Sequence, residues 1–232
     1  MGDNDTRPPD AHRPEDFLGA MNDVERRNAP QQLFVAGDVR LLRSGLRISV
    51  VGTREPTRDG IERTRALAAT LAKRGITVVS GLAKGVDTAA HTTAIEVGGR
   101  TIAVLGTPLD AVYPAENREL QARIVREHLA VSQFPSGSRF GTKAFPMRNR
   151  TMALLSDATI IVEAGEGSGT LHQGWEALRL GRPLFLLESL CKRVDLAWPK
   201  EMLDFGAEVL TRENLDESLA EVPGRTRSEL AF

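Results

Sequence analysis

The sequence has little of several features that identify particular classes of protein. It contains one cysteine, Cys191, in 232 residues, which excludes an intramolecular disulfide and a zinc site built from several cysteines. The formal net charge is −1, so a surface that binds a polyanion must come from a local cluster of cations. No apolar run approaches the length that spans a bilayer, and residues 1–30 contain no apolar signal-peptide core. These absences favour a cytoplasmic protein without a membrane segment.

The two ends of the chain lack sustained apolar spacing. The first thirty residues mix charge with proline, which predicts a disordered polar tail over residues 1–30, with room for a short helix around residues 14–21. Residues 31–212 are richer in apolar positions and are predicted to form the folded domain. Residues 213–232 become polar again, and we expect a short C-terminal helix and a tail there.

Between the ends, apolar runs alternate with helical patterns. After an edge strand and turn within residues 33–45, strands are predicted at residues 46–51, 76–80, 101–105, 129–134, 158–163 and 183–187. Helices are predicted at residues 59–74, 87–97, 115–128 and 169–180, and three of them stop at a glycine. This alternation predicts an α/β fold with a doubly wound, mostly parallel sheet.

Three of the predicted strands end abruptly at loops that carry glycine. Backbone amides at Gly52, Gly81 and Gly169 can approach a phosphate closely, because no Cβ intervenes. A parallel sheet brings such loops together at the carboxyl ends of its strands. Four cations that we expect to be exposed accompany the loops: Arg54, Lys84, Arg148 and Arg150. The sequence therefore predicts a site for a polyanion at this edge of the sheet.

Five segments follow one another in a distinctive order. They are Val51-Gly52-Thr53-Arg54; Ser80-Gly81-Leu82-Ala83-Lys84-Gly85-Val86-Asp87; Thr101-Ile102-Ala103-Val104-Leu105-Gly106 with Tyr113-Pro114; Phe145-Pro146-Met147-Arg148-Asn149-Arg150; and Val162-Glu163-Ala164 with Ser168-Gly169-Thr170-Leu171. In order and spacing, this set resembles the DNA-processing protein A family, also called Smf. An ordered set of segments is far more specific than a lone glycine motif. The resemblance spans roughly residues 30–210 and implies an extended Rossmann-like fold.

The resemblance implies a role without catalysis. Members of the family bind single-stranded DNA during natural transformation, protect it and help to load the RecA recombinase, usually as homodimers. No catalytic residue, metal or cofactor is implied. Carried over position by position, the DNA- or phosphate-binding residues are Gly52, Arg54, Ser80, Gly81, Lys84, Arg148, Asn149, Arg150, Ser168, Gly169 and Thr170. Aromatic residues are scarce near these loops, and Phe145 and Phe140 are the nearest candidates for base stacking.

The sequence leaves two alternatives open. The segment Gly167-Ser168-Gly169-Thr170 also resembles a motif of nucleoside-monophosphate phosphoribohydrolases, which carry a glutamate three residues after the threonine. This chain has Gln173 there, and an amide cannot act as a general base, although Glu176 lies nearly one helical turn further on. The second alternative is a pocket that senses a nucleotide without catalysis.

Overall fold

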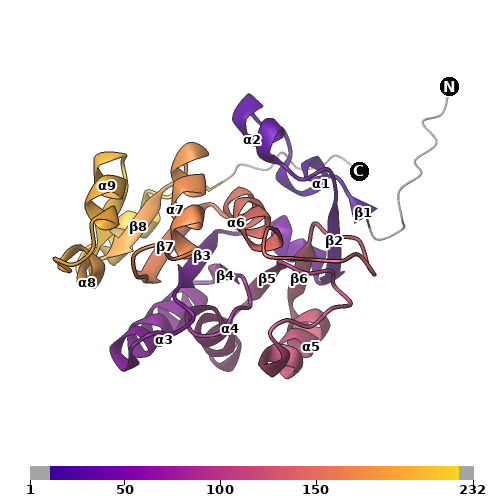
Figure 1. Ribbon diagram of the computed structural model, residues 1–232, viewed down its shortest axis with the longest axis horizontal. Coiled ribbons are helices and arrows are strands. Elements are labelled where there is room, and N and C mark those ends of the chain that lie inside the picture. The colour runs from indigo at the N-terminus through magenta and orange to yellow at the C-terminus, as the bar shows by residue number, and fades with distance from the viewer. Residues whose placement is uncertain (1–10, 225–232) are drawn as a thin grey trace.

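The computed structural model describes residues 11–224, in which helices cover both faces of one sheet (Figure 1). The strands are β1 (Ala11–His12), β2 (Leu33–Gly37), β3 (Arg47–Gly52), β4 (Thr77–Ser80), β5 (Thr101–Leu105), β6 (Leu129–Ser132), β7 (Ala158–Glu163), β8 (Leu184–Leu187) and β9 (Glu208–Leu210). Their order in the sheet is β1-β2-β6-β5-β4-β3-β7-β8-β9. All neighbours from β6 to β9 pair in parallel, whereas β1 and β2 join as antiparallel strands. This topology confirms the predicted doubly wound, mostly parallel α/β fold.

The order of the strands reverses at the centre of the sheet. From β3 the chain adds β4, β5 and β6 in one direction, then returns to place β7 on the other side of β3. β3 and β7 pair directly, with Ser49 opposite Thr159. In such sheets the loops that follow the two central strands diverge to opposite faces and leave a crevice at the carboxyl ends. The crevice expected from this topology therefore lies beyond Gly52 and Glu163.

Helices pack on the two faces according to the alternation of side chains along the strands. On β3, Val50 joins the core beneath α3 and α4, whereas Val51 joins the core on the face of α6 and α7. Figure 1 shows α3, α4 and α5 on one face and α6 and α7 on the other. The helices are α1 (Glu15–Leu18), α2 (Asp23–Asn28), α3 (Arg58–Lys73), α4 (Val86–Glu96), α5 (Arg118–Glu127), α6 (Ala144–Leu155), α7 (Thr170–Arg179), α8 (Glu188–Cys191), α9 (Trp198–Asp204) and α10 (Leu215–Ala220), with the 3-10 turns η1 (Val39–Leu42) and η2 (Ala115–Asn117).

Most predicted elements are present within two residues of their expected ends. The predicted helix at residues 115–128 is divided into η2 and α5, and the sequence did not predict β9, α8 or α9. Residues 151–156 have a helical pattern in the sequence, and residues 151–155 form the second half of α6, which begins at Ala144. Among residues 11–224, no helix is both long and apolar enough to cross a membrane.

The expectation of a disordered tail does not hold for residues 11–30; residues 1–10 lie outside the described residues. β1 pairs with β2, and Phe17, Leu18 and Met21 enter the core on the α6 face. Helix α2 begins with a capping box between Asn22 and Glu25. The short helix allowed around residues 14–21 is present as α1, and the burial of these three apolar residues anchors the segment.

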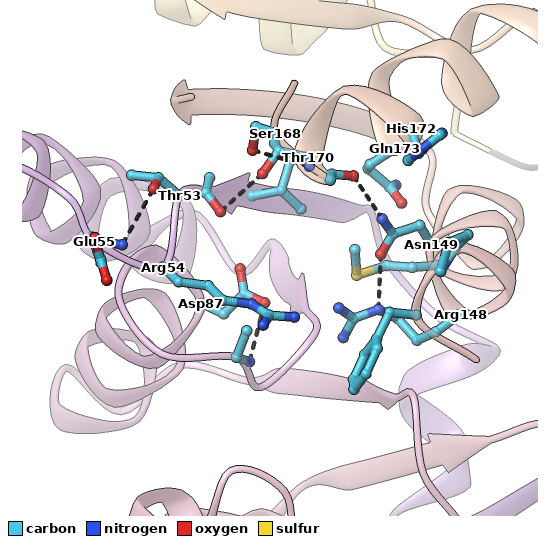
Figure 2. A pocket seen from close by; sticks show the side chains of 17 residues that line it. Thr53, Arg54, Glu55, Asp87, Arg148, Asn149, Ser168, Thr170, His172 and Gln173 are labelled. Carbon is cyan, nitrogen blue, oxygen red and sulfur yellow. Dashed lines mark hydrogen bonds between the residues drawn. The ribbon is translucent and has the colours of Figure 1, made fainter. Parts of the chain in front are cut away.

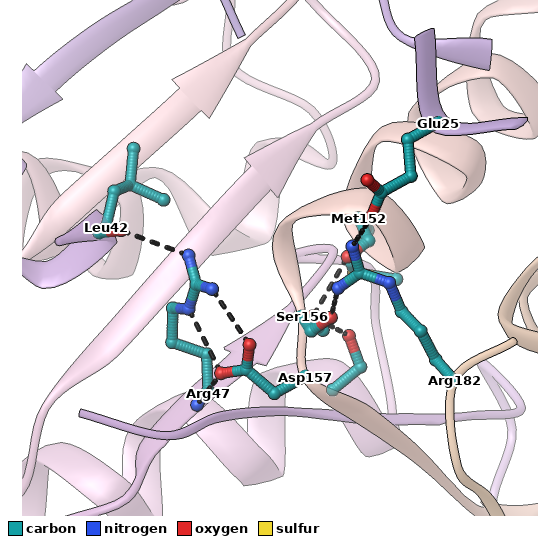
Figure 3. Close-up of polar contacts among 8 residues, drawn as sticks. Glu25, Leu42, Arg47, Met152, Ser156, Asp157 and Arg182 are labelled. Carbon is teal, nitrogen blue, oxygen red and sulfur yellow. Dashed lines mark hydrogen bonds and ion pairs between the residues drawn. The ribbon is translucent and has the colours of Figure 1, made fainter. Parts of the chain in front are cut away.

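Buried polar contacts hold the amino end of the central strands together (Figure 3). Arg47, the first residue of β3, pairs with Asp157, which precedes β7, at 3.0 Å between Nη2 and Oδ1. The two side chains are 0% and 1% exposed. Arg47 also donates from Nη1 to the carbonyl of Leu42 at 3.1 Å. Beside this pair, the guanidinium of Arg182 pairs with the carboxylate of Glu25 at 2.9 Å and so connects α2 to the strand β8 region.

Candidate functional site

A cavity of about 370 Å³ lies at the carboxyl ends of β3 and β7, where the strand order reverses (Figure 2). Its walls come from segments that are far apart in the sequence. They are residues 51–55 at the end of β3 and just after it, residues 83 and 87 around the start of α4, residues 145, 146, 148, 149 and 152 on α6, and residues 168–170, 172 and 173 at the start of α7. Three loops and one helix thus converge on one space, at the position that the topology leaves open.

The loop between β3 and α3 is held in place by Glu163. Its backbone carbonyl accepts from the amide of Thr53 at 2.7 Å. Its carboxylate accepts from the amide of Thr57 at 2.9 Å and from the hydroxyl of Thr57 at 2.8 Å. Gly60 leaves room for this carboxylate, which a Cβ there would overlap. Arg54 is therefore carried by an anchored loop, and its exposed guanidinium lies over the ring of Phe145, 5.4 Å from the centroid.

The loop between β7 and α7 is tied to both β3 and α6. The hydroxyl of Thr170 donates to the carbonyl of Gly52 at 2.9 Å, and the side-chain amide of Asn149 donates to the carbonyl of Gly169 at 3.0 Å. Gly169 is the N-cap residue of α7 and lines the cavity, so the positive end of the helix dipole is adjacent to it. The hydroxyl of Ser168 accepts from the amide of Thr170 at 3.3 Å. Gly169 has φ −59°, and the left-handed residue of this loop is Gly167, with φ +68°.

Arg148 is buried, so the expectation that its side chain is exposed is wrong. Its Nη1 donates to the carbonyls of Gly81 and Val104, the latter at 3.0 Å, and its Nε donates to Asn149 Oδ1 at 2.9 Å. A Cβ on Gly81 would overlap the guanidinium. Arg148 still lines the cavity, where it joins β4, β5 and α6 as well as contributing charge.

Asp87 is the counter-charge of Arg148 in this buried region. Its carboxylate accepts from the amides of Gly81 and Ala83, each at 3.2 Å. Burial raises the pKa of Asp87, and the positive charge of Arg148 opposes that shift. Burial likewise lowers the pKa of Arg148, while Asp87 raises it. Much of the charge of Arg148 is thus balanced within the protein, and Arg54 is the cation that the cavity presents most openly.

The cavity brings together seven of the eleven predicted site residues: Gly52, Arg54, Arg148, Asn149, Ser168, Gly169 and Thr170. Gly81 and Lys84 instead line a smaller adjoining hollow of about 50 Å³. Lys84 is exposed and pairs with Glu116.

Ser80 and Arg150 line neither space. Ser80 is fully buried and donates to the carbonyl of Val50 at 2.8 Å. Arg150 lies on the outer side of α6, where its Nε is 3.3 Å from Glu176.

A family model described as DNA recombination-mediator protein A matches residues 12–222. The chain belongs to this family. Protein Smf of Synechocystis sp. is 42% identical over 177 residues, which make up 76% of this chain and 44% of that protein. The chain spans between 44% and 65% of the length of the curated relatives that it matches.

Two solved structures of DNA processing protein A share the fold. The protein from Streptococcus pneumoniae has a TM-score of 0.78 at 31% identity and covers 95% of this chain and 76% of its own. The protein from Helicobacter pylori has a TM-score of 0.75 at 31% identity, with coverages of 88% and 94%. The structure of the H. pylori protein concerns its unique single-stranded DNA binding mode.

The structure also identifies residues of this family member that motif reading did not select as site residues. Asp87 and Thr53 line the cavity, and so do His172 and Gln173. The signal for Asp87 was its place in the first turn of α4, immediately after a glycine loop, where a carboxylate can accept from free amides. Glu176, the carboxylate that an enzyme of the phosphoribohydrolase type would need, does not line the cavity and pairs with Arg150 and Arg179.

Within residues 11–224, no three side chains of His, Cys, Asp or Glu are grouped as a metal site would require. The carboxylates that line the cavity are Glu55, which is exposed, and Asp87, which two backbone amides hold. The charged side chains that line the cavity are thus two arginines and two carboxylates. Because Asp87 balances Arg148, the groups that suit a phosphate or another anion are the exposed Arg54 and the N-terminus of α7.

Proposed function

We propose that this chain binds single-stranded DNA without catalysing a reaction, and that it acts in DNA processing during recombination, as in natural transformation and RecA loading. The observation that carries the proposal is the convergence of Arg54, Arg148 and the N-terminus of α7 on one cavity at the crevice of the sheet. Membership of the DNA recombination-mediator family supports it. The proposal includes a cytosolic homodimer with RecA as a partner.

The proposed contacts are directed mainly at phosphate. Arg54 and Lys84 are exposed cations on loops that follow neighbouring strands, and Arg54 lines both the cavity and the adjoining hollow. Two separate cations do not form the rigid set of hydrogen bonds to base edges by which proteins recognise a sequence in a DNA groove. We therefore expect binding with little sequence preference and with a clear dependence on salt.

The test is a titration of a fluorescent oligo-dT with the whole chain at several salt concentrations. If two to four phosphates are neutralised, log K against log salt has a slope of about −1.4 to −2.8, from about −0.7 per contact on single strands. A duplex of the same length is the matched competitor and should bind more weakly. Equal affinity for duplex and single strand, or a slope near zero, would refute the proposal.

A second candidate is a sensor of a free nucleotide, because a cavity of about 370 Å³ falls in the range of small-molecule sites. A thermal-shift series with mononucleotides distinguishes the two functions. Stabilisation by a mononucleotide at micromolar concentration, with no binding of oligo-dT, would favour the sensor. Hydrolysis of the nucleotide is disfavoured, since Gln173 occupies the position that a catalytic carboxylate would need and Glu176 points to two arginines.

A further inference from the structure

Three aromatic residues form a row beside the cavity. The ring centroids of Phe145 and Tyr113 lie 5.4 Å apart, and those of Tyr113 and Phe140 lie 6.2 Å apart. Phe145 belongs to the first turn of α6, Tyr113 to the segment between β5 and η2, and Phe140 to the segment between β6 and α6. The row therefore begins at the cavity wall and extends away from it over segments that follow β5 and β6.

The first ring of the row is partly buried, whereas the other two are exposed. Phe145 packs so closely against Gly106 that a Cβ there would lie 2.7 Å from the ring, and Arg54 lies over the ring. Tyr113 is 43% exposed and Phe140 is 40% exposed. Of the two aromatic residues favoured by the sequence, Phe145 thus serves mainly as a support for Arg54. The free aromatic surface belongs to Tyr113 and Phe140.

The exposed rings are continuous with the candidate DNA site. Arg54, Phe145 and Arg148 line both the cavity and the adjoining hollow, and Tyr113 lines the hollow together with Lys84. A strand that leaves the cavity through this hollow would pass Lys84 with a phosphate and reach Tyr113 with the next base. The Lys84–Glu116 pair does not block this path, because both side chains are more than half exposed and such pairs are weak.

We propose that Tyr113 and Phe140 form a stacking platform for the base that follows the nucleotide in the cavity. Because the two rings meet edge to face at 62°, one ring lies against the base and the other supports it. The inference rests on the proposed DNA binding and gives the bound strand a direction, from the cavity across the hollow towards the β6–α6 segment. Aromatic rings next to a cationic groove suit a nucleobase, because every base has a flat face whatever its identity. The platform therefore adds affinity for single strands without adding sequence preference.

The experiment compares two oligonucleotides of equal length, oligo-dT and an abasic strand that keeps every phosphate. The variants are Tyr113→Ala with Phe140→Ala, each alone and together. The matched control is Phe205→Ala, since Phe205 is a 72% exposed ring that contacts Trp175 and lines neither the cavity nor the hollow. Tyr113→Phe and Phe140→Tyr keep the rings and check the fold, and every variant is compared with wild type by thermal melting.

We expect the double variant to bind oligo-dT about 5- to 150-fold more weakly, from about 1–3 kcal/mol for a stacked base and 1.4 kcal/mol per tenfold. Its affinity for the abasic strand, and the salt slope on oligo-dT, should match those of the wild type. Equal losses on both oligonucleotides, or no loss on oligo-dT, would overturn the platform. Failure of the wild-type protein to bind oligo-dT would instead refute the proposed function. If the double variant has a lowered melting temperature, the single variant Phe140→Ala is the test. Its loss of affinity must still be confined to oligonucleotides that carry bases.

Discussion

Removing the charge of Asp157 should destabilise the protein strongly while leaving the DNA site intact. In Asp157→Asn the guanidinium of Arg47 stays buried at 0% exposure and loses the carboxylate at 3.0 Å. The asparagine oxygen can still accept from the Arg47 amide, which donates to Asp157 Oδ2 at 2.8 Å in the wild type. The loss is therefore chiefly that of the counter-charge. Breaking a buried pair in this way costs about 3–5 kcal/mol, out of the roughly 5–15 kcal/mol that stabilises a typical domain.

The assay is urea denaturation together with thermal melting. A loss of this size lowers the melting temperature by about 6–20 °C, at roughly 2–4 °C per kcal/mol for a chain of this length. Adding Arg47→Met to Asp157→Asn removes the uncompensated charge and should restore at least half of the lost free energy. Glu62→Gln is the control for a solvated pair, since Arg58 and Glu62 are 91% and 63% exposed.

Two results would refute this reasoning. One is a loss below about 1 kcal/mol, which would mean that water or a rearranged partner replaces the carboxylate. The other is a double variant no more stable than Asp157→Asn, which would show that packing rather than charge governs the site. Oligo-dT affinity at low temperature should stay unchanged in both variants, because Arg47 begins β3 and the cavity lies beyond its other end.

Three further outcomes are expected. Arg54→Ala should weaken oligo-dT binding and flatten the salt slope by about 0.7, with an unchanged melting temperature. Arg150→Ala should change neither the affinity for oligo-dT nor the salt slope, because Arg150 lies outside the cavity. Equal effects of the two substitutions would contradict the geometry. Gly169→Ala should melt like the wild type, because the space around its Cβ position is open. Gly169→Asp should bind oligo-dT poorly, because it places a negative charge at the N-terminus of α7. Tight binding by the Asp variant would exclude this N-terminus as a contact. Burial lowers the pKa of His91 to about 3, so between about pH 6.5 and pH 3 the unfolded chain binds more protons than the folded protein. The free energy of unfolding should therefore fall as the pH drops through this range. His91→Gln should flatten this pH dependence in urea titrations, and an unchanged profile would contradict the prediction.

The sequence predicts best those elements that are determined by one local pattern. The central strands are continuous apolar runs because helices cover both faces, and β5 and β7 have the predicted bounds. β9 was missed because its three residues include the exposed Glu208 and form too short a pattern at the sheet edge. The order of the strands, from which the crevice follows, depends on pairings that no local pattern encodes.

The loops that the sequence predicts to converge line one cavity, but local sequence patterns do not separate a solvent-facing cation from a buried one. Arg54 sits in a loop whose orientation depends on Glu163, more than 100 residues away in the sequence. Seven predicted residues line the cavity because glycine loops after parallel strands necessarily converge there. Ser80 ends a strand and is buried by its neighbours, so its proximity to a glycine loop was misleading.

The burial of Arg148 follows from the helical spacing of its neighbours once the start of α6 is known. Helix α6 begins at Ala144 and places Pro146 in its first turn, where no amide is needed for an intrahelical bond. Once the helix extends over residues 144–155, Arg148 shares a face with Met152 and Leu155, both of which are buried. Arg150 falls on the opposite side and is exposed. The two arginines of one short motif therefore have different roles: Arg148 holds the carbonyls of Gly81 and Val104 beneath the cavity, and Arg150 pairs with Glu176 outside it.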